Sequence, residues 1–374
     1  MSNSEAPDNP NGPRPPRLAS SSYLEAMQVM EQAMGLATIV HTRNRDPRWL
    51  EFVARSQPSL FQSPDWASLM EETYGFPARV AMVLENGAVV GGLPYSEIED
   101  FRGRRRVAGA FADVCEPLGD PRIWPIVERA MCEEGVPWQI RSRAKPSELA
   151  SEIREVGVLQ TVELQRSADE AFLKCDSKKR NKLRLGARAA LTSRSMYGES
   201  SIDAFYRLHS LTRKEKHRLL PQPKKLFEEI AQRFLPDRGF VLAIEREKSV
   251  IATALLIAYG DTLYVKFAAS NRADLMHRPN DFLFWKIIEY AIGADFRAVD
   301  MGLSETEDLA RFKRGYGAES TPAYVGKYGI DKLKTPPARM VEEALQQVTA
   351  AMTEPDVPLA VAQAGGDALY RFFV

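Results

Sequence analysis

An internal repeat at a shift of 161 residues is the feature that most constrains the fold of this chain. The shift superposes Trp66 on Phe227, Trp124 on Trp285 and residues 88–90 on 249–251. It also places Ile126, Glu128 and Ala130 on Ile287, Glu289 and Ala291. Three elements in register predict two copies of one structural unit. A length of 374 residues agrees with two domains of ordinary size.

The same order of elements is predicted in both copies: a helix, antiparallel strands, a second helix and a final strand. In the first copy, Ser63 and Pro64 start a helix that ends before Gly75. The turn Glu85-Asn86-Gly87 is typical of a hairpin. The first copy is predicted to contain helices at 22–34, 61–74 and 123–134 and strands at 79–84, 88–98, 104–111 and 138–143.

The second copy is predicted to contain a helix at 227–234, strands at 240–244, 250–259 and 262–268, a helix from Asn280 or Asp281 to Ile292, and a strand at 297–300. We therefore expect an α/β (α+β) protein with two tandem domains, each a mixed, mainly antiparallel sheet flanked by helices. The expected divisions are a disordered tail (1–22), an N-terminal domain (23–166), a C-terminal domain (167–334), and a C-terminal helix with an apolar docking tail (335–374).

A basic helix is predicted between the copies, at residues 178–191, with Asp176 or Ser177 as its cap. Arg180, Arg184 and Arg188 recur at every fourth position and share one face. Guanidinium groups on one face suit a pyrophosphate or an RNA backbone, and the alternative is a solvated basic face. A second helix, at 202–216, precedes a loop that contains prolines.

The charges of the chain balance, with 50 basic and 50 acidic residues, so local clusters must bind any anionic partner. The three cysteines and four histidines show no ligand spacing, which argues against a zinc site or a disulfide framework. The first 22 residues lack the apolar core of a signal peptide. No window is apolar enough to predict a membrane span, so we expect a cytoplasmic protein that does not bind DNA.

Residues 302–317 combine a short helix with a cluster of cations. Asp300 ends an apolar strand, and Ser304 with Glu307 predicts a capping box. Gly315 is expected to end the helix in the left-handed conformation, so that Arg311, Lys313 and Arg314 occupy the last turn. The cations either stabilise the helix end or contact a substrate.

Three further groups of residues are candidates for a cleft. Asp300 is either a general base paired with Lys313 or Arg314, or part of a structural ion pair. Tyr264 and Lys266 alternate on one strand and either line a cleft or cover the solvent side of a sheet. Asp113 and Glu116 follow a strand end, and at least one arginine of the run Arg102, Arg104, Arg105 and Arg106 must point inward or lie at an edge.

Five segments together resemble a known family: 179–188 (KRNKLRLGAR), 206–223, 268–285, Asp300-Met301-Gly302, and 312–317 (FKRGYG). The chain resembles the FemAB-like branch of the GNAT acyltransferase superfamily, which includes aminoacyltransferases that form peptidoglycan bridges and BioF2-like acetyltransferases. The resemblance covers residues 58–328 and is weaker in the first half.

The resemblance implies two GNAT-like domains that face one cleft, and transfer of an acyl or aminoacyl group to an amine. It implies that Lys313 stabilises charge on the acyl carbonyl or holds substrate phosphate, and that Asp300 orients Lys313 or assists proton removal. Arg180 and Arg184 would bind phosphate. The remaining expected substrate contacts are Tyr264, Lys266, Asn280, Phe312 and Arg314. No cofactor would be bound permanently, and the acceptor would be a small-molecule or cell-envelope precursor amine.

Two departures from the family pattern bear on the donor. The turn at 277–282 lacks the glycines with which a GNAT enzyme binds the pyrophosphate of coenzyme A, and Pro279 removes a backbone donor. This argues against standard binding of coenzyme A and favours an aminoacyl-tRNA donor or an unusual mode of thioester binding. No coiled-coil arm is inserted between Arg188 and Phe240, so the acceptor need not be a cell-wall precursor. The alternatives are an acyl-CoA-dependent N-acetyltransferase and a non-catalytic module that binds a nucleotide-sugar or RNA.

Overall fold

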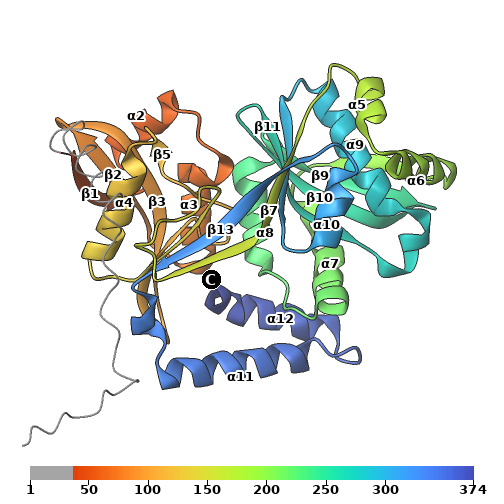
Figure 1. Cartoon of the computed structure of the whole chain (residues 1–374). Helices are drawn as coiled ribbons and strands as arrows, with labels where there is room; N and C mark the ends of the chain where they lie inside the picture. The colour runs from red at the N-terminus through yellow and green to blue at the C-terminus, as the bar shows by residue number, and fades with distance from the viewer. Residues whose placement is uncertain (1–36) are drawn as a thin grey trace, which may run out of the picture.

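The computed structural model describes residues 37–374, and Figure 1 shows two α/β lobes joined by two long strands. Within these residues, thirteen strands form one mixed sheet in which most neighbours are antiparallel. Helices flank the sheet in both lobes, so the predicted fold class is confirmed. The predicted disordered tail (1–22) and the predicted helix at 22–34 lie outside the described residues.

In the first half of the chain, the predicted helices at 61–74 and 123–134 and the four predicted strands form, whereas the elements at 37–43, 47–55, 118–119 and 152–163 were not predicted. The Ser63 hydroxyl caps the helix that starts at Pro64, and Gly75 ends it in the left-handed conformation with φ 73°. Gly109, with φ 56°, follows the third predicted strand, which ends at Ala108 rather than at Phe111. The elements are β1 (Ala37–Arg43), α2 (Pro47–Arg55), η1 (Leu60–Gln62), α3 (Pro64–Tyr74), β2 (Ala78–Glu85), β3 (Ala88–Asp100), β4 (Gly103–Ala108), β5 (Leu118–Gly119), α4 (Ile123–Glu133), β6 (Trp138–Ser142) and β7 (Glu152–Glu163).

The second half begins with two short helices and then repeats the order of the first. Its elements are α5 (Ala168–Lys174), α6 (Ser177–Arg188), β8 (Thr192–Met196), α7 (Glu199–Leu211), the π-helical turn η2 (Thr212–His217), α8 (Lys224–Phe234), β9 (Gly239–Arg246), β10 (Ser249–Tyr259), β11 (Thr262–Ser270), η3 (Arg272–His277), α9 (Pro279–Gly293), β12 (Ala298–Ser304), α10 (Glu307–Arg314), β13 (Glu319–Tyr328) and η4 (Ile330–Leu333).

Several predicted helix ends in the second half were wrong. Helix α9 begins at Pro279, because a proline suits the first helical position, and neither Asn280 nor Asp281 is its cap. Helix α10 is capped by the Thr306 hydroxyl, which accepts the Leu309 N–H. Ser304 lies in β12 and donates to Gln160 instead, so the predicted capping box does not form.

Gly315 does not adopt the left-handed conformation predicted for it. Its φ is −56°, and the left-handed residue of this turn is Gly317, with φ 84°. Gly315 is needed for space rather than for its φ: a Cβ atom there would lie 2.7 Å from Cε of Lys179 and 3.2 Å from a carboxylate oxygen of Asp176. The predicted helix at 178–191 ends at Arg188, and the one at 202–216 continues beyond Leu211 only as the π-helical turn η2.

The repeat is visible in the order of the strands. The shift of 161 residues carries β2 onto β9 residue for residue and β3 onto the start of β10. The sheet order is β1-β2-β3-β4-β6-β13-β7-β12-β11-β10-β9-β8, so the strands of the two halves run inward in matching order from both edges. At the centre, however, β13 pairs with β6 and β7 pairs with β12. Each half therefore contributes its last strand to the sheet of the other half (Figure 1).

The predicted boundary at residues 166 and 167 falls between β7 and α5, in a segment that joins the two halves of the chain. Because β7 and β13 are exchanged, each of the two chain segments on either side of this boundary contains a strand that pairs with strands of the other segment. The residue limits of the two domains stay a prediction.

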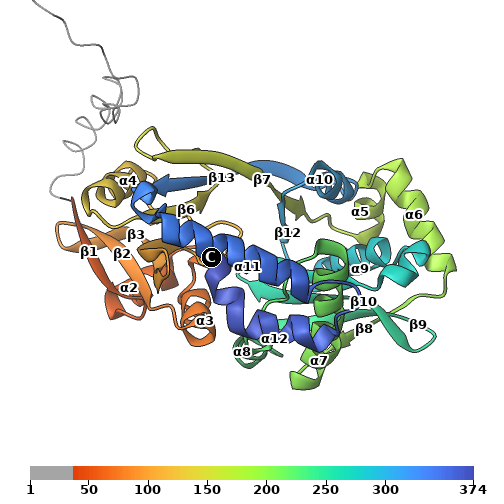
Figure 2. The same cartoon turned by 90° about the horizontal axis from the view of Figure 1, so that it is seen from below.

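The hydrophobic core also connects the lobes. One cluster contains Phe61 and Trp66 from the first half together with Phe205 and Phe227 from the second, and a second cluster lies beneath α9. Helix α11 (Pro336–Met352) passes under both lobes, α12 (Leu359–Leu369) returns, and η5 (Tyr370–Phe373) ends between them (Figure 2). The apolar tail thus docks on the body, as predicted. Within residues 37–374, no helix is long and apolar enough to cross a membrane.

Candidate functional site

A β-bulge in β11 directs Lys266 toward the first lobe. Leu255 of β10 pairs with Phe267 and Leu256 pairs with Val265, so Lys266 is the extra residue of the bulge. Bulges of this kind change the direction of a side chain next to many active sites. The Lys266 amino group lies 4.6 Å from the ring centre of Phe61, and Tyr264 also contacts this ring. Of the two alternatives from the sequence, the buried cleft is therefore correct.

A second irregularity occurs in β12, next to β11. The two strands are parallel but pair only from Thr262 to Tyr264, opposite Ala298 to Asp300. Beyond Asp300 the pairing of β12 with β7 shifts register, and the Asp300 carboxylate accepts the N–H of Gly302 at 2.7 Å. Gly302 has φ 73°, and a Cβ atom there would lie 3.1 Å from the Asp113 carboxylate. A glycine is thus required where Asp113 approaches β12.

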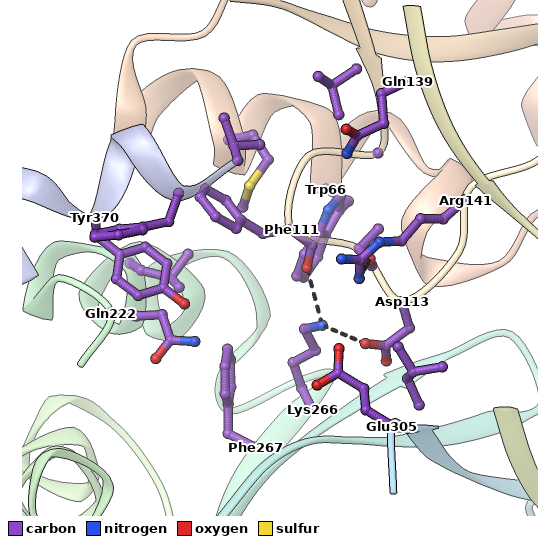
Figure 3. A pocket seen from close by; sticks show the side chains of 18 of the residues that line it. Trp66, Phe111, Asp113, Gln139, Arg141, Gln222, Lys266, Phe267, Glu305 and Tyr370 are labelled. Carbon is purple, nitrogen blue, oxygen red and sulfur yellow. Dashed lines mark hydrogen bonds and ion pairs between the residues drawn. The ribbon is translucent and has the colours of Figure 1, made fainter. Parts of the chain in front are cut away.

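Asp113 brings the first lobe to this point. Its carboxylate lies 3.8 Å from the Lys266 amino group, which also donates to the carbonyl of Phe111 at 3.5 Å (Figure 3). Asp113 and Lys266, from different halves of the chain, therefore meet across the cleft. Together with Asp300 and Lys313 they form what we call the junction cluster.

Two cavities adjoin the junction cluster. The central cavity, of about 510 Å³, has Asp113 and Lys266 on its wall together with aromatic side chains, Arg141, and Arg213, whose guanidinium lies 5.9 Å from the ring centre of Tyr370. Its aromatic residues are Trp66, Phe111, Phe267, Tyr370 and Phe373. The second cavity, of about 910 Å³, has Asp300 and Tyr264 on its wall. The cluster can thus be approached from both cavities.

Burial shifts the pKa values of Asp300 and Lys313 toward neutrality. The pKa of Asp300 is raised to about 6, first by burial and then by the negative charge of Asp113. The pKa of Lys313 is lowered to about 8, because burial outweighs the attraction of Asp113 and Asp300. Burial also lowers the pKa of Lys266 and raises that of Tyr264 to about 12. A carboxyl near 6 and an amine near 8 can exchange protons at physiological pH.

Lys313 reaches the cluster from behind the backbone of β12. It is 3% exposed, and its amino group donates to the carbonyls of Gly302 and Leu303 at 3.0 and 3.1 Å. An ammonium group has three donors, so one N–H has no protein acceptor among the described residues. The hypothesis of a direct ion pair with Asp300 was wrong for both cations: Lys313 is held by the two carbonyls, and Arg314 pairs with Glu307.

A buried lysine holds the turn that follows Lys313. The Lys179 amino group lies 2.8 Å from Asp281 and 3.8 and 4.0 Å from the ring centres of Phe312 and Tyr316. The Tyr316 hydroxyl donates to the backbone carbonyl of Asp281. This group, which we call the lysine clamp, attaches α6 and α9 to the end of α10. The predicted substrate contact Phe312 is therefore part of the clamp.

The other predicted contacts lie away from the junction cluster. Arg180 donates to the carbonyls of Leu173 and Cys175, and Arg184 is exposed, 5.4 Å from the ring centre of Phe172. Asn280 lies in a separate cavity with Ser270 and Lys216. Glu116 accepts hydrogen bonds from the backbone of Arg143 and Ala144, which is a structural role.

Three residues of the central cavity escaped the sequence reasoning. Arg141 and Arg213 form no ion pair in the described part of the chain, and each donates to a backbone carbonyl, of Ala112 and Leu220 respectively. Tyr370 belongs to the tail, for which the sequence indicated docking but no function. The alternation of β6 could have suggested Arg141, but nothing in the sequence places Tyr370 in a cleft.

Comparisons with known proteins bear on the family and on the fold of this chain. Residues 177–314 match the model of the acetyltransferase (GNAT) domain. The chain is 23% identical over 164 residues to a UDP-N-acetylmuramoylpentapeptide-lysine N(6)-alanyltransferase of Weissella viridescens, which is 43% of this chain and 48% of that protein. The chain thus spans about half the length of this curated relative. A crystal structure of FemX superposes with a TM-score of 0.58 at 14% identity, over 83% of this chain and all of the other.

Proposed function

We propose that the protein is an N-acyltransferase that transfers an acyl or aminoacyl group to an amine, because residues 177–314 match the acetyltransferase (GNAT) domain model and the chain shares its fold with FemX. The observation that carries the proposal is the junction cluster: Asp300, with a pKa of about 6, lines one cavity, Lys266 and Asp113 line the other, and Lys313, with a pKa of about 8, is buried behind β12. Two substrates must meet in such a reaction, and two cavities admit them separately.

The proposed chemistry needs a base and a stabilised oxyanion. The acceptor ammonium gives a proton to Asp300, directly or through water, and the neutral nitrogen attacks the acyl carbon. A C–N bond forms, and the C–O bond of an ester donor or the C–S bond of a thioester donor breaks. The proton returns to the departing oxygen or sulfur. The unassigned N–H of Lys313 supplies the positive charge that stabilises the oxyanion.

We assign the acceptor to the central cavity. Its aromatic wall suits an apolar body, and Arg141 and Arg213, which have no carboxylate partner in the described residues, suit an anionic group. The curated relative acts, by its name, on the lysine of a UDP-N-acetylmuramoyl pentapeptide. An amine with a carboxylate or phosphate on the same molecule is therefore the proposed acceptor, and a cell-envelope precursor is one example.

We propose aminoacyl-tRNA as the donor, in a cytoplasmic reaction. Coenzyme A would need free backbone N–H groups at the start of α9. There, Pro279 has no N–H, and the buried Lys179 ammonium is already paired with the Asp281 carboxylate. The exposed guanidinium of Arg184, with Arg180 beside it on α6, remains a proposed contact for donor phosphate. Isothermal titration tests the choice, since micromolar binding of coenzyme A would overturn it.

Lys313→Met tests the reaction itself. We expect turnover to fall about 100-fold or more, the usual loss when an oxyanion donor is removed. Arg314→Met is the matched control. Arg314 is the residue next to Lys313, is exposed, and pairs only with Glu307 within the described chain. Transfer from labelled donors is followed by mass spectrometry, with circular dichroism to verify folding. An active Lys313→Met enzyme would refute the role of Lys313. Salt-sensitive binding without any product would favour a binding module instead.

A further inference from the structure

The C-terminal segment Tyr370–Val374 forms one wall of the central cavity. Tyr370, Phe373 and Val374 all line this cavity, opposite the junction cluster. Figure 3 shows the Tyr370 ring beside Phe111, at the end of the cavity away from Asp113. Tyr370 is 9% exposed, and its ring centre lies 5.3 Å from that of Phe111. The aromatic end of the cavity is thus built partly from the last residues of the chain.

The neighbouring phenylalanines of the tail face different surroundings. The Phe373 side chain faces the cavity, and its ring centre is 6.0 Å from that of Tyr370. The Phe372 ring packs on Phe101 at 5.9 Å and does not line the cavity. Of these two adjacent residues of one type, only Phe373 contacts the cavity.

The arginine run, which occupies the turn after β3 and strand β4, holds this wall of the cavity in place. Arg102 donates to the backbone carbonyl of Phe372 at 2.9 Å, and Arg105 donates to that of Val374 at 3.3 Å. Both guanidinium groups pair with the buried carboxylate of Asp100, at 3.0 and 2.8 Å. The sequence required at least one arginine of the run to point inward, and Arg105, 4% exposed, does so. Buried ion pairs of this kind hold one geometry.

We infer that Tyr370 and Phe373 determine which acceptors fit the central cavity, with Arg102 and Arg105 holding them in place. The inference rests on the proposed function, because it assigns the acceptor to this cavity. A ring on the wall of the cavity excludes any acceptor long enough to reach it. Its removal admits that acceptor, and one methylene in such a pocket changes selectivity by about tenfold or more.

The test compares Tyr370→Ala and Phe373→Ala with Phe372→Ala. The acceptors are lysine and lysine-containing di- and tripeptides, with the donor that the wild-type enzyme uses. We expect the ratio of kcat/KM for the longest acceptor to that for lysine to rise about tenfold in the first two variants. We expect it to stay within twofold of wild type in Phe372→Ala. The same ratio in all four proteins, or an equal rise in Phe372→Ala, would overturn the inference.

A second pair of variants changes arginines that lie outside the cavity, one of which holds the C-terminal segment. Arg102→Gln removes the hydrogen bond to Phe372, whereas Arg104→Gln affects an exposed arginine that pairs with Glu97. We expect only Arg102→Gln to broaden the acceptor range. A change in neither variant would refute the part assigned to Arg102.

Calorimetry of the same acceptors separates this inference from the proposed reaction. A wild-type protein that binds the series with a size limit, but forms no product, would refute the proposed transfer and retain the role of the tail. An active enzyme whose size limit is unchanged in Tyr370→Ala and Phe373→Ala would support the proposed transfer and refute the role of the tail. Absence of both binding and product would overturn both.

Discussion

The Asp300 carboxyl and the Lys313 amine owe their properties to where β12 places them. Asp300 lies within the sheet beside Tyr264 and close to the charge of Asp113, so its pKa is raised to about 6. Lys313 is enclosed by protein, and its pKa is lowered to about 8. In the range between these two values, Asp300 is ionised while Lys313 keeps its proton. That is the combination that the proposed reaction requires.

We therefore expect a bell-shaped dependence of kcat/KM on pH. Activity rises through about pH 6 as Asp300 loses its proton, and falls above about pH 8 as Lys313 loses its own. The two groups interact through charge, so the apparent values belong to the junction cluster as a whole. The measurement is initial rate against pH with donor and acceptor below saturation.

Two variants assign the limbs of this profile. Asp300→Asn has no carboxyl to titrate, so the acidic limb is expected to disappear along with most of the activity. Lys313→Arg keeps its charge at all accessible pH values, and the alkaline limb is expected to disappear. A wild-type rate that stays constant from about pH 5 to about pH 9 would contradict both assignments.

The sequence predicted which residues gather at the junction cluster better than it predicted their contacts. Tyr264 and Lys266 were identified from strand alternation, Asp300 from its place at the end of an apolar strand and Lys313 from the 312–317 motif, and the fold brings them together. Lys313 was expected to pair with Asp300, but it bonds two carbonyls of β12. The difference arises from the bulge after Asp300, and local sequence does not reveal a bulge. For Arg184, helical periodicity predicted which face of the helix carries the side chain, but it did not predict which residues lie next to that face.

The helix α6 and the turn after α10 depend on each other through the lysine clamp. Lys179 is 3% exposed, and burial lowers its pKa despite the attraction of Asp281. The Asp176 N–H also donates to the Gly315 carbonyl at 3.0 Å. The sequence had indicated Lys179 as one charge of a basic stretch, because helical spacing does not distinguish a solvated lysine from an enclosed one. Only the neighbouring rings of Phe312 and Tyr316 do.

Gly315→Ala is expected to loosen this contact. The added methyl group would lie 2.7 Å from Cε of Lys179, which cannot move aside between two rings. Overpacking of this kind costs about 1–3 kcal/mol of unfolding free energy. Because the turn carries Lys313, kcat should fall more than KM rises. Denaturant unfolding and steady-state kinetics measure the two effects.

Gly293→Ala is the matched control for this substitution. Gly293 is also at the end of a helix, and a Cβ atom there would meet nothing within 4 Å. Its stability should be unchanged or slightly higher, since alanine restricts the unfolded chain. Equal stability of Gly315→Ala and Gly293→Ala would contradict the role of Gly315.

At the level of the whole molecule, the exchange of β7 and β13 joins two units that the repeat had suggested were separable. Hydrophobic periodicity identified most of the strands, but it does not specify which strand pairs with which. Nothing local in β7 shows that its neighbours are β12 and β13 rather than β6. The sequence thus predicted two copies of a unit and could not predict that they share strands.

The two halves should fold only together. A fragment of residues 1–166 retains β7 without either of its neighbours, and a fragment of 167–374 retains β13 without β6. Unpaired strands with apolar faces aggregate. We expect each fragment alone to be unfolded or aggregated, and the co-expressed fragments to form a 1:1 complex. Size-exclusion chromatography and circular dichroism test this, and cooperative unfolding of either isolated fragment would contradict it.

The strand exchange also bears on how such a molecule could diverge. Two identical chains trading their last strands would make a symmetric dimer, in which every substitution appears twice. Once both copies lie in one gene, they can change independently. At the shift of 161 residues, Asp300 corresponds to Gln139 and Gly302 to Arg141. One copy thus holds the ionisable carboxyl, while the other places an amide and a cation on the cavity wall. Two copies in one chain can thus hold different side chains at corresponding positions, which two identical chains cannot.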